Sequence, residues 1–134
     1  VSCELGRVGT TVRTEDNFAA SASLGGGRVL ASICGSRATR SRTGPIELAG
    51  EGGVLFGDHA LNLAWLVRGT EASALDVGPP LPTVRETFAA FVTALGRGEP
   101  MPITLDDGLR AVAVLRACYQ SAAEGRAVPV AAID

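Results

Sequence analysis

The chain has 134 residues, 46% of them apolar and 19% charged, which excludes a disordered protein and allows one domain with a modest core. Its formal net charge is −2, with charges of both signs scattered along the sequence, which excludes the basic surface of a nucleic-acid-binding protein. No apolar run is long enough to span a membrane. All 12 basic residues are arginine, which excludes a lysine Schiff base or a lysine general acid within the chain.

Three cysteines, Cys3, Cys34 and Cys118, stand far apart in the sequence. Their odd number and the absence of a C-x-x-C pair argue against a disulfide framework. We therefore expect buried free thiols in a reducing compartment, and hence a cytoplasmic protein.

Residues 1–77 carry patterns typical of antiparallel strands. Apolar and polar residues alternate with the period of two that a half-buried strand requires, and glycine turns at 25–27 and 50–53 separate the strands. The alternation is clearest over 59–67. The predicted strands cover residues 1–9, 15–24, 29–36, 45–49, 54–56, 59–67 and 72–77.

A proline-rich linker over 78–82 separates the strands from two helices, because proline lacks the amide donor of a strand ladder and disfavours helix in the residue before it. The first helix is predicted over 83–96, with Thr83 as its N-cap and an apolar stripe at helical spacing. Gly96 and Gly98 are predicted to end it.

The second helix is predicted over 104–124. Thr104 is its N-cap, and Asp107, three residues later, completes a pattern close to a capping box. Gly125 is its stop signal, and a short edge strand is predicted at 128–130.

Strands followed by helices indicate a single α+β domain over residues 1–134, with one open, mainly antiparallel sheet and both helices on one of its faces. The other face is left uncovered, and an open apolar face of this kind favours self-association. We expect a homo-oligomer formed through the face that bears Leu61, Leu63 and Trp65.

Three segments resemble the carboxyl-terminal domain of one oxidoreductase family. The first is EDNFAASASLGGGRVLASI, an acidic pair followed by an alternating strand, a glycine turn and a second strand. The second is the hairpin PIELAGEGGVLF, and the third is the helical end FAAFVTALGRGEPMPITLDDGLRAVAVLRACYQSAAEGRAVPV. By their order and spacing, from about Glu4 to Val130, the chain is similar to the glucose–fructose oxidoreductase and inositol dehydrogenase (Gfo/Idh/MocA) family.

This resemblance implies a two-domain oxidoreductase that transfers hydride between nicotinamide and a sugar, polyol or related carbinol. Its amino-terminal Rossmann domain would hold NAD or NADP, and its catalytic lysine, aspartate and histidine would lie upstream of Val1. The chain itself lacks lysine, has no G-x-G-x-x-G after a strand, and carries its single histidine, His59, away from the family's catalytic position. We therefore expect a substrate-binding and oligomerisation domain that is inactive by itself, with no catalytic, cofactor-binding or metal-binding residue of its own.

The substrate-pocket candidates are Arg37, Arg40 and Arg42, because guanidinium groups match carboxylate and phosphate ligands. A solvated loop with spaced charges is the alternative for this segment. Trp65 could stack on a sugar face, although a core or interface tryptophan is the more common case on an alternating strand.

Other polar residues favour structural roles. His59 is predicted to be structural or interfacial, since Asp58 beside it would point to the opposite face of a strand. Asp106 and Asp107 are explained by the dipole of the helix that they begin rather than by a metal site.

Two further functions stay open for the chain. One is a stand-alone α+β module that binds a small ligand or dimerises without catalysis. The other is a small enzyme that uses His59 together with an acid.

Overall fold

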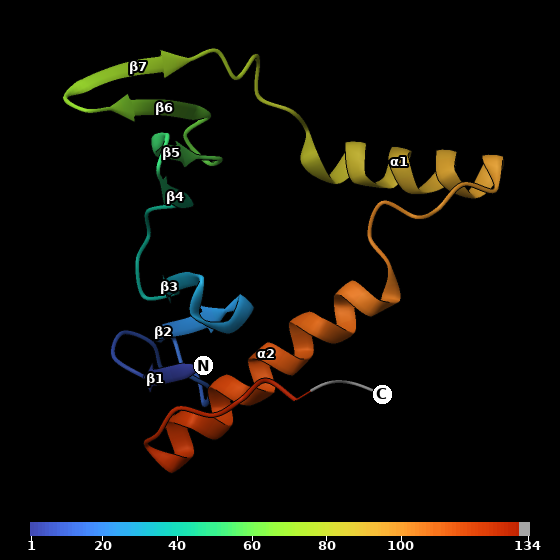
Figure 1. The fold of residues 1–134 in the computed structure, drawn as a ribbon. Coiled ribbons are helices and arrows are strands. Elements are labelled where there is room, and N and C mark those ends of the chain that lie inside the picture. Colours follow the sequence, from blue (N-terminus) through green and yellow to red (C-terminus); the bar gives the residue numbers. More distant parts are fainter. Residues whose placement is uncertain (132–134) are drawn as a thin grey trace. The chain divides into compact units, whose positions relative to one another are not determined.

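The computed structural model describes residues 1–131 and has the predicted α+β class, with antiparallel strands and two helices (Figure 1). The strands form two sheets, one of three strands and one of four, where the sequence predicts a single sheet. The chain divides into two compact units, each with one sheet and one helix. Unit 1 combines Val1–Arg40 with the segment from Glu99 onward, and unit 2 comprises Ser41–Gly98.

The sheet of unit 1 is an antiparallel meander of β1 (Ser2–Gly6), β2 (Asn17–Leu24) and β3 (Val29–Ser36), in that order. The predicted hairpin is confirmed, since β2 and β3 pair along their whole lengths across the glycine turn Gly25–Gly27. The three glycines have φ values of 57°, 69° and 92°, a conformation that residues with a side chain rarely adopt.

Helix α2 (Leu105–Glu124) of unit 1 begins and ends as the sequence predicts. Thr104 Oγ1 accepts the Asp107 amide at 3.2 Å, and the Asp107 carboxylate accepts the Thr104 amide at 2.9 Å, which completes a capping box. Gly125, with φ of 62°, ends the helix. The helix packs on β1, and its buried residues follow one stripe at a spacing of four: Ala113, Ala117 and Ser121.

One buried hydroxyl holds the junction between β1 and α2. Ser121 Oγ accepts the Cys3 amide at 3.0 Å and donates to the Arg126 carbonyl at 2.7 Å. Ser121 is only 2% exposed, so water has little access to replace either hydrogen bond.

The segment after α2 returns to the beginning of β1. The Val1 amino group donates to the Val128 carbonyl at 2.6 Å, and the Val128 amide donates to the Val1 carbonyl at 2.9 Å. The edge strand predicted at 128–130 is wrong, because the segment has no strand beyond this single pair of residues. Pro129 has no amide hydrogen with which to extend a ladder.

Unit 2 contains a four-stranded antiparallel meander. Its strands, in spatial order, are β4 (Pro45–Gly50), β5 (Gly53–Asp58), β6 (Leu63–Arg68) and β7 (Glu71–Leu75). The turn between β4 and β5 requires glycine at position 53, which has φ of 128° and where a Cβ would lie 2.3 Å from the Val67 carbonyl oxygen.

The long strand predicted over 59–67 is wrong in its first half. β6 begins at Leu63, and the residues before it form a turn. The Asp58 carboxylate accepts the Ala60 amide at 2.8 Å, which bends the chain, and Asn62 adopts a positive φ of 53°. The apolar alternation of the sequence therefore runs through a turn.

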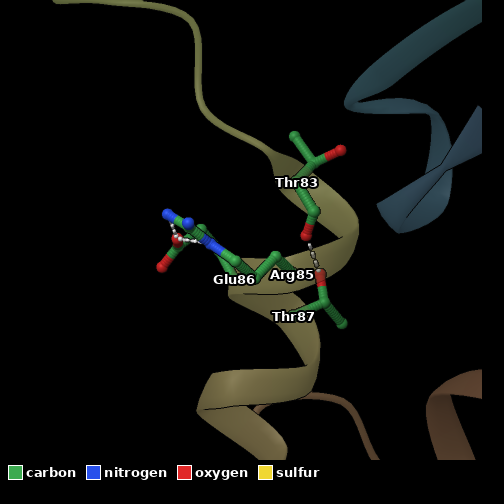
Figure 2. Close-up of polar contacts among 4 residues, drawn as sticks. All are labelled: Thr83, Arg85, Glu86 and Thr87. Carbon is green, nitrogen blue, oxygen red and sulfur yellow. Dashed lines mark hydrogen bonds and ion pairs between the residues drawn. The ribbon is translucent and has the colours of Figure 1, made fainter.

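Helix α1 (Thr83–Arg97) of unit 2 lacks the side-chain cap that the sequence predicts at Thr83. Thr83 is the first helical residue, and Pro82 is the N-cap, whose carbonyl accepts the Glu86 amide at 3.1 Å. The Thr83 carbonyl instead accepts the Thr87 hydroxyl at 2.8 Å (Figure 2). Proline fixes the entry to this helix, and no side chain caps it.

Most of α1 is exposed, and Ala94 is its one buried residue. Arg85 and Glu86 form a salt bridge of 2.9 Å, which contributes little because both side chains are solvated (Figure 2). Phe88, in the predicted apolar stripe, is 66% exposed. Gly98 ends the helix with φ of 64°, whereas Gly96 lies inside it, contrary to the prediction that both glycines end it.

We expect Ser121→Ala to lower the free energy of unfolding by about 1–3 kcal/mol, because the Cys3 amide would be buried without an acceptor. Urea denaturation of the chain, followed by circular dichroism, measures the loss. Ser23→Ala in β2, at an exposed position, is the matched control and should change the stability by less than about 0.5 kcal/mol. Equal losses in the two variants would contradict the role of Ser121.

Candidate functional site

A cavity of about 430 Å³ lies within unit 1, where the sheet meets α2. Most of its wall is apolar, and a few charged and polar side chains converge on it, which is the usual form of a small-molecule site. The lining residues are Cys3, Leu5, Glu15, Asp16, Asn17, Phe18, Gly35, Ser36, Arg37, Leu115, Cys118 and Tyr119.

Glu15 and Tyr119 form a hydrogen-bonded pair at this cavity. The Tyr119 hydroxyl donates to the Glu15 carboxylate. This hydrogen bond lowers the pKa of Glu15 and raises the pKa of Tyr119. At neutral pH the carboxylate is therefore ionised and the phenol is protonated, so the pair offers several acceptor lone pairs to a hydroxylated ligand.

The Arg37 guanidinium is held beside this pair by the segment that precedes β2. Its Nη2 donates to the Glu15 carbonyl at 2.6 Å and to Thr14 Oγ1 at 2.9 Å, and the Arg37 amide donates to the Asp16 carbonyl at 2.6 Å. A guanidinium carries five N–H donors, which is more than these side-chain contacts use. Arg37 thus brings a fixed positive charge to the cavity.

Asp16 has a structural role next to Glu15. Its carboxylate, in a residue that is 3% exposed, accepts the amides of Val8 at 2.9 Å, Gly9 at 3.0 Å and Thr10 at 2.7 Å. These hydrogen bonds, led by that from Val8, hold the pKa of Asp16 far below its usual range despite the opposing effect of burial. The carboxylate ties the loop after β1 to the start of β2.

The Phe18 ring reaches the cavity because its partner across the sheet is glycine. Phe18 pairs with Gly35 in the β2–β3 ladder. A Cβ at position 35 would lie 2.5 Å from a carbon of the Phe18 ring. The absence of a side chain there leaves room for the aromatic wall.

Of the three arginines predicted to edge a substrate pocket, Arg37 lines the cavity, whereas Arg40 and Arg42 are not among its lining residues. Arg40 belongs to unit 1 and Arg42 to unit 2. The pairing of Glu15 with Tyr119, which lie 104 positions apart, was not predicted from the sequence. The only signals were local ones: Glu15 is the first residue of a predicted strand, and Tyr119 lies on one face of a predicted helix.

His59 lies in unit 2 and makes a local backbone contact. Its Nδ1 is 3.2 Å from the Gly44 carbonyl oxygen, and a Cβ at position 44 would lie 1.9 Å from the imidazole ring. Asp58 binds backbone amides, including that of Gly44 at 3.1 Å. Burial raises the pKa of Asp58, but these amides more than offset it and the pKa is lowered. This geometry supports a structural histidine rather than an acid–histidine pair.

The three interface candidates are divided by the turn before β6. Leu63 and Trp65 lie on one face of β6, and Trp65 pairs with Phe56 across the sheet. Leu61 lies in the turn, so the prediction that all three share one strand face is wrong. Trp65 is 41% exposed and Leu61 is 57% exposed.

The cysteines differ in burial. Cys3 is buried, as predicted, and Cys118 is half-buried, but Cys34 is exposed. The prediction for Cys34 is wrong because alternation along β3 places it on the sheet face opposite Gly35, which lines the cavity.

No group of three or more His, Cys, Asp or Glu side chains among residues 1–131 is placed to hold a metal ion. None of the helices in the same range is both long and apolar enough to cross a membrane.

These features define an α+β domain with open antiparallel sheets, a capped terminal helix and a polar-edged cavity beside that helix. Residues 4–131 match the family model described as the oxidoreductase family, C-terminal alpha/beta domain (GFO_IDH_MocA_C). The chain therefore belongs to this family, which confirms the resemblance found in the sequence. No curated protein sequence matches the chain.

Solved structures support the same fold. An oxidoreductase from Agrobacterium radiobacter, in complex with NAD+, L-tartaric acid and magnesium, matches 96% of this chain with 20% identity and a TM-score of 0.79. A proposed oxidoreductase from Bacillus subtilis, yvaA, matches 93% with 14% identity and a TM-score of 0.67. The chain spans 42% and 43% of these two structures, so it corresponds to less than half of either.

The Asp16 carboxylate predicts an acid-sensitive fold. Its pKa is lower in the folded state than in the unfolded chain, so its stabilisation is complete above about pH 4 and is lost as the pH falls toward the folded-state pKa. We expect Asp16→Asn to have a lower Tm at pH 7 and to lose less further stability than the wild type below about pH 4.

Thermal unfolding at a series of pH values measures this effect. Asp106→Asn, which removes an exposed carboxylate at the first turn of α2, should keep the acid dependence of the wild type. An Asp16→Asn variant with the acid dependence of the wild type would contradict the prediction.

Proposed function

We propose that the chain is the substrate-binding and oligomerisation domain of an NAD(P)-dependent oxidoreductase that acts on a sugar, a polyol or a related hydroxylated compound. The family membership supports the reaction class. The NAD+ in the Agrobacterium radiobacter structure supports a nicotinamide cofactor for the complete enzyme. The cavity of unit 1 is the observation that carries the substrate-binding part of the proposal.

The cofactor is assigned to a separate dinucleotide-binding domain. A glycine motif that binds phosphate joins a strand to the N-terminus of a helix. Gly25–Gly27 instead joins β2 to β3, and Arg28 Nε donates to the Gly25 carbonyl at 2.9 Å across this turn. The turn does not fit a pyrophosphate group, so no step of hydride transfer is assigned to this chain.

The cavity suits a hydroxylated ligand because its polar groups combine donors and acceptors. Glu15 supplies a carboxylate, Tyr119 a phenol and Arg37 a guanidinium, while Leu5 and Phe18 offer apolar surface to the C–H faces of a ligand. In the complete enzyme these side chains would bind and orient the carbinol. Proton and hydride transfer would fall to groups outside the chain.

The test compares arginines that do and do not line the cavity, in the complete enzyme. Arg37→Met should raise KM about 10-fold or more, because losing a charged hydrogen-bond donor costs about 1.5–3 kcal/mol. Tyr119→Phe, which removes only a hydroxyl, should also raise KM. Arg40→Met is the matched control and should stay within about 2-fold of the wild type. Equal effects of Arg37→Met and Arg40→Met would contradict substrate binding in this cavity.

The assembly part of the proposal depends on the sheet of unit 2. One face bears Phe56, Leu63 and Trp65, and the other bears Ile46 and Leu48. Trp65 is 41% exposed and Ile46 is 58% exposed, and apolar surface of this kind favours contact with another protein surface. We assign the Trp65 face to a second copy of the chain, since aromatic side chains are enriched at the centres of interfaces.

We expect the wild-type chain to self-associate at tens of micromolar and Trp65→Glu to be monomeric, because a buried unpaired charge strongly disfavours association. Light scattering measures both masses. Ile46→Glu places the same charge on the opposite face and should leave the association intact. A monomeric wild type, or dissociation by Ile46→Glu but not by Trp65→Glu, would contradict the assigned face.

A further inference from the structure

Two of the three cysteines line the same cavity although they are far apart in the sequence. Cys3 lies in β1 and is 4% exposed, and Cys118 lies in α2 and is half-buried. Both are part of the wall of the 430 Å³ cavity, whereas Cys34 is exposed and is not among its lining residues.

The contact between β1 and α2 brings these two thiols together. The Cys3 amide donates to Ser121 Oγ at 3.0 Å, and Ser121 follows Cys118 by three residues, which places both on one side of the helix. Burial raises the pKa of the Cys3 thiol, and the charge and hydrogen bond of the Cys118 side chain raise it further. The two thiols therefore lie on the same wall of the cavity, and both are free.

We propose that Cys3 and Cys118 are an oxidation-sensitive thiol pair, which a peroxide converts into a disulfide that joins β1 to α2. The shared cavity wall and the anchoring of Cys3 one helical turn from Cys118 carry this proposal. It is independent of the proposed function, because it requires neither a nicotinamide cofactor nor a substrate.

The reaction proceeds in two balanced steps and begins at Cys118, the more exposed thiol. The Cys118 sulfur attacks one peroxide oxygen, so that an S–O bond forms, the O–O bond breaks and the departing hydroxide leaves as water after taking up a proton. The Cys3 sulfur then attacks the Cys118 sulfur, so that the S–S bond forms, the S–O bond breaks and a second water leaves. The two thiols lose two electrons and two protons, and one peroxide is reduced to two waters.

The disulfide would limit the relative motion of β1 and α2 in unit 1. In the reduced chain, β1 is joined to α2 by packing and by the Ser121 hydrogen bond. A covalent bond beside that hydrogen bond would prevent the strand and the helix from separating. The oxidation state of the pair would thus decide whether the cavity can open along this wall.

Trypsin places each cysteine on its own peptide, because the chain contains arginine at suitable positions. The peptides are residues 1–7 for Cys3, 29–37 for Cys34 and 117–126 for Cys118. The full chain is treated with hydrogen peroxide, unfolded, alkylated with N-ethylmaleimide, digested without reductant and analysed by mass spectrometry.

We expect peptides 1–7 and 117–126 to appear as one linked species, about 2 Da lighter than their sum, with peptide 29–37 alkylated. Dithiothreitol should separate the linked peptides. Alkylation of all three cysteines after peroxide treatment would overturn the proposal, and so would Cys34 linked to either partner in place of the expected pair.

The variants test the assignment of the two thiols. Cys34→Ser is the matched control and should retain the linked species. Cys3→Ser should leave Cys118 as a sulfenic acid that dimedone traps, and the absence of this adduct would overturn the assigned order of attack. The peptide map is made on the wild-type chain, so the proposal remains testable even where a variant does not fold.

Discussion

The hydrogen bonds of the Ser121 hydroxyl are the interaction on which unit 1 depends, because they join a strand from the beginning of the chain to a helix near its end. The paired backbone groups of Val1 and Val128 close the same junction. The cavity lies where this sheet meets α2, so Tyr119 can meet Glu15 only while the strand and the helix remain packed. The shape of the cavity therefore depends on Ser121, which is not among its lining residues.

Two adjacent acids have different roles: Asp16 is structural, and Glu15 lies at the cavity. The Asp16 carboxylate accepts hydrogen bonds from backbone amides, and the Glu15 carboxylate accepts one from the Tyr119 phenol at the cavity. Both pKa values are lowered by hydrogen bonds, but the first group fixes a loop while the second remains beside open space. The buried Asp16 thus holds in place the segment that presents the half-buried Glu15.

Local signals in the sequence predicted the elements better than their assembly. The capping pair Thr104 and Asp107 and the glycine turns have strong, short-range chemistry, so the ends of α2 and the hairpin of unit 1 were predicted well. The turn at Asn62 was missed because apolar alternation continues through it. The division into two sheets and the pairing of Glu15 with Tyr119, across 104 positions, depend on long-range contacts for which a single sequence holds no local signal.

The discontinuous path of unit 1 has a consequence during synthesis. Each strand of unit 2 after the first pairs with one that has already been synthesised, since β4 to β7 are neighbours in order. The Cys3 amide finds its acceptor only 118 residues later. At about 5–20 residues per second, β1 waits roughly 6–24 s for its helix. During that time the nascent sheet of unit 1 has an uncovered apolar face, and it is the part of the chain that a ribosome-bound chaperone would meet.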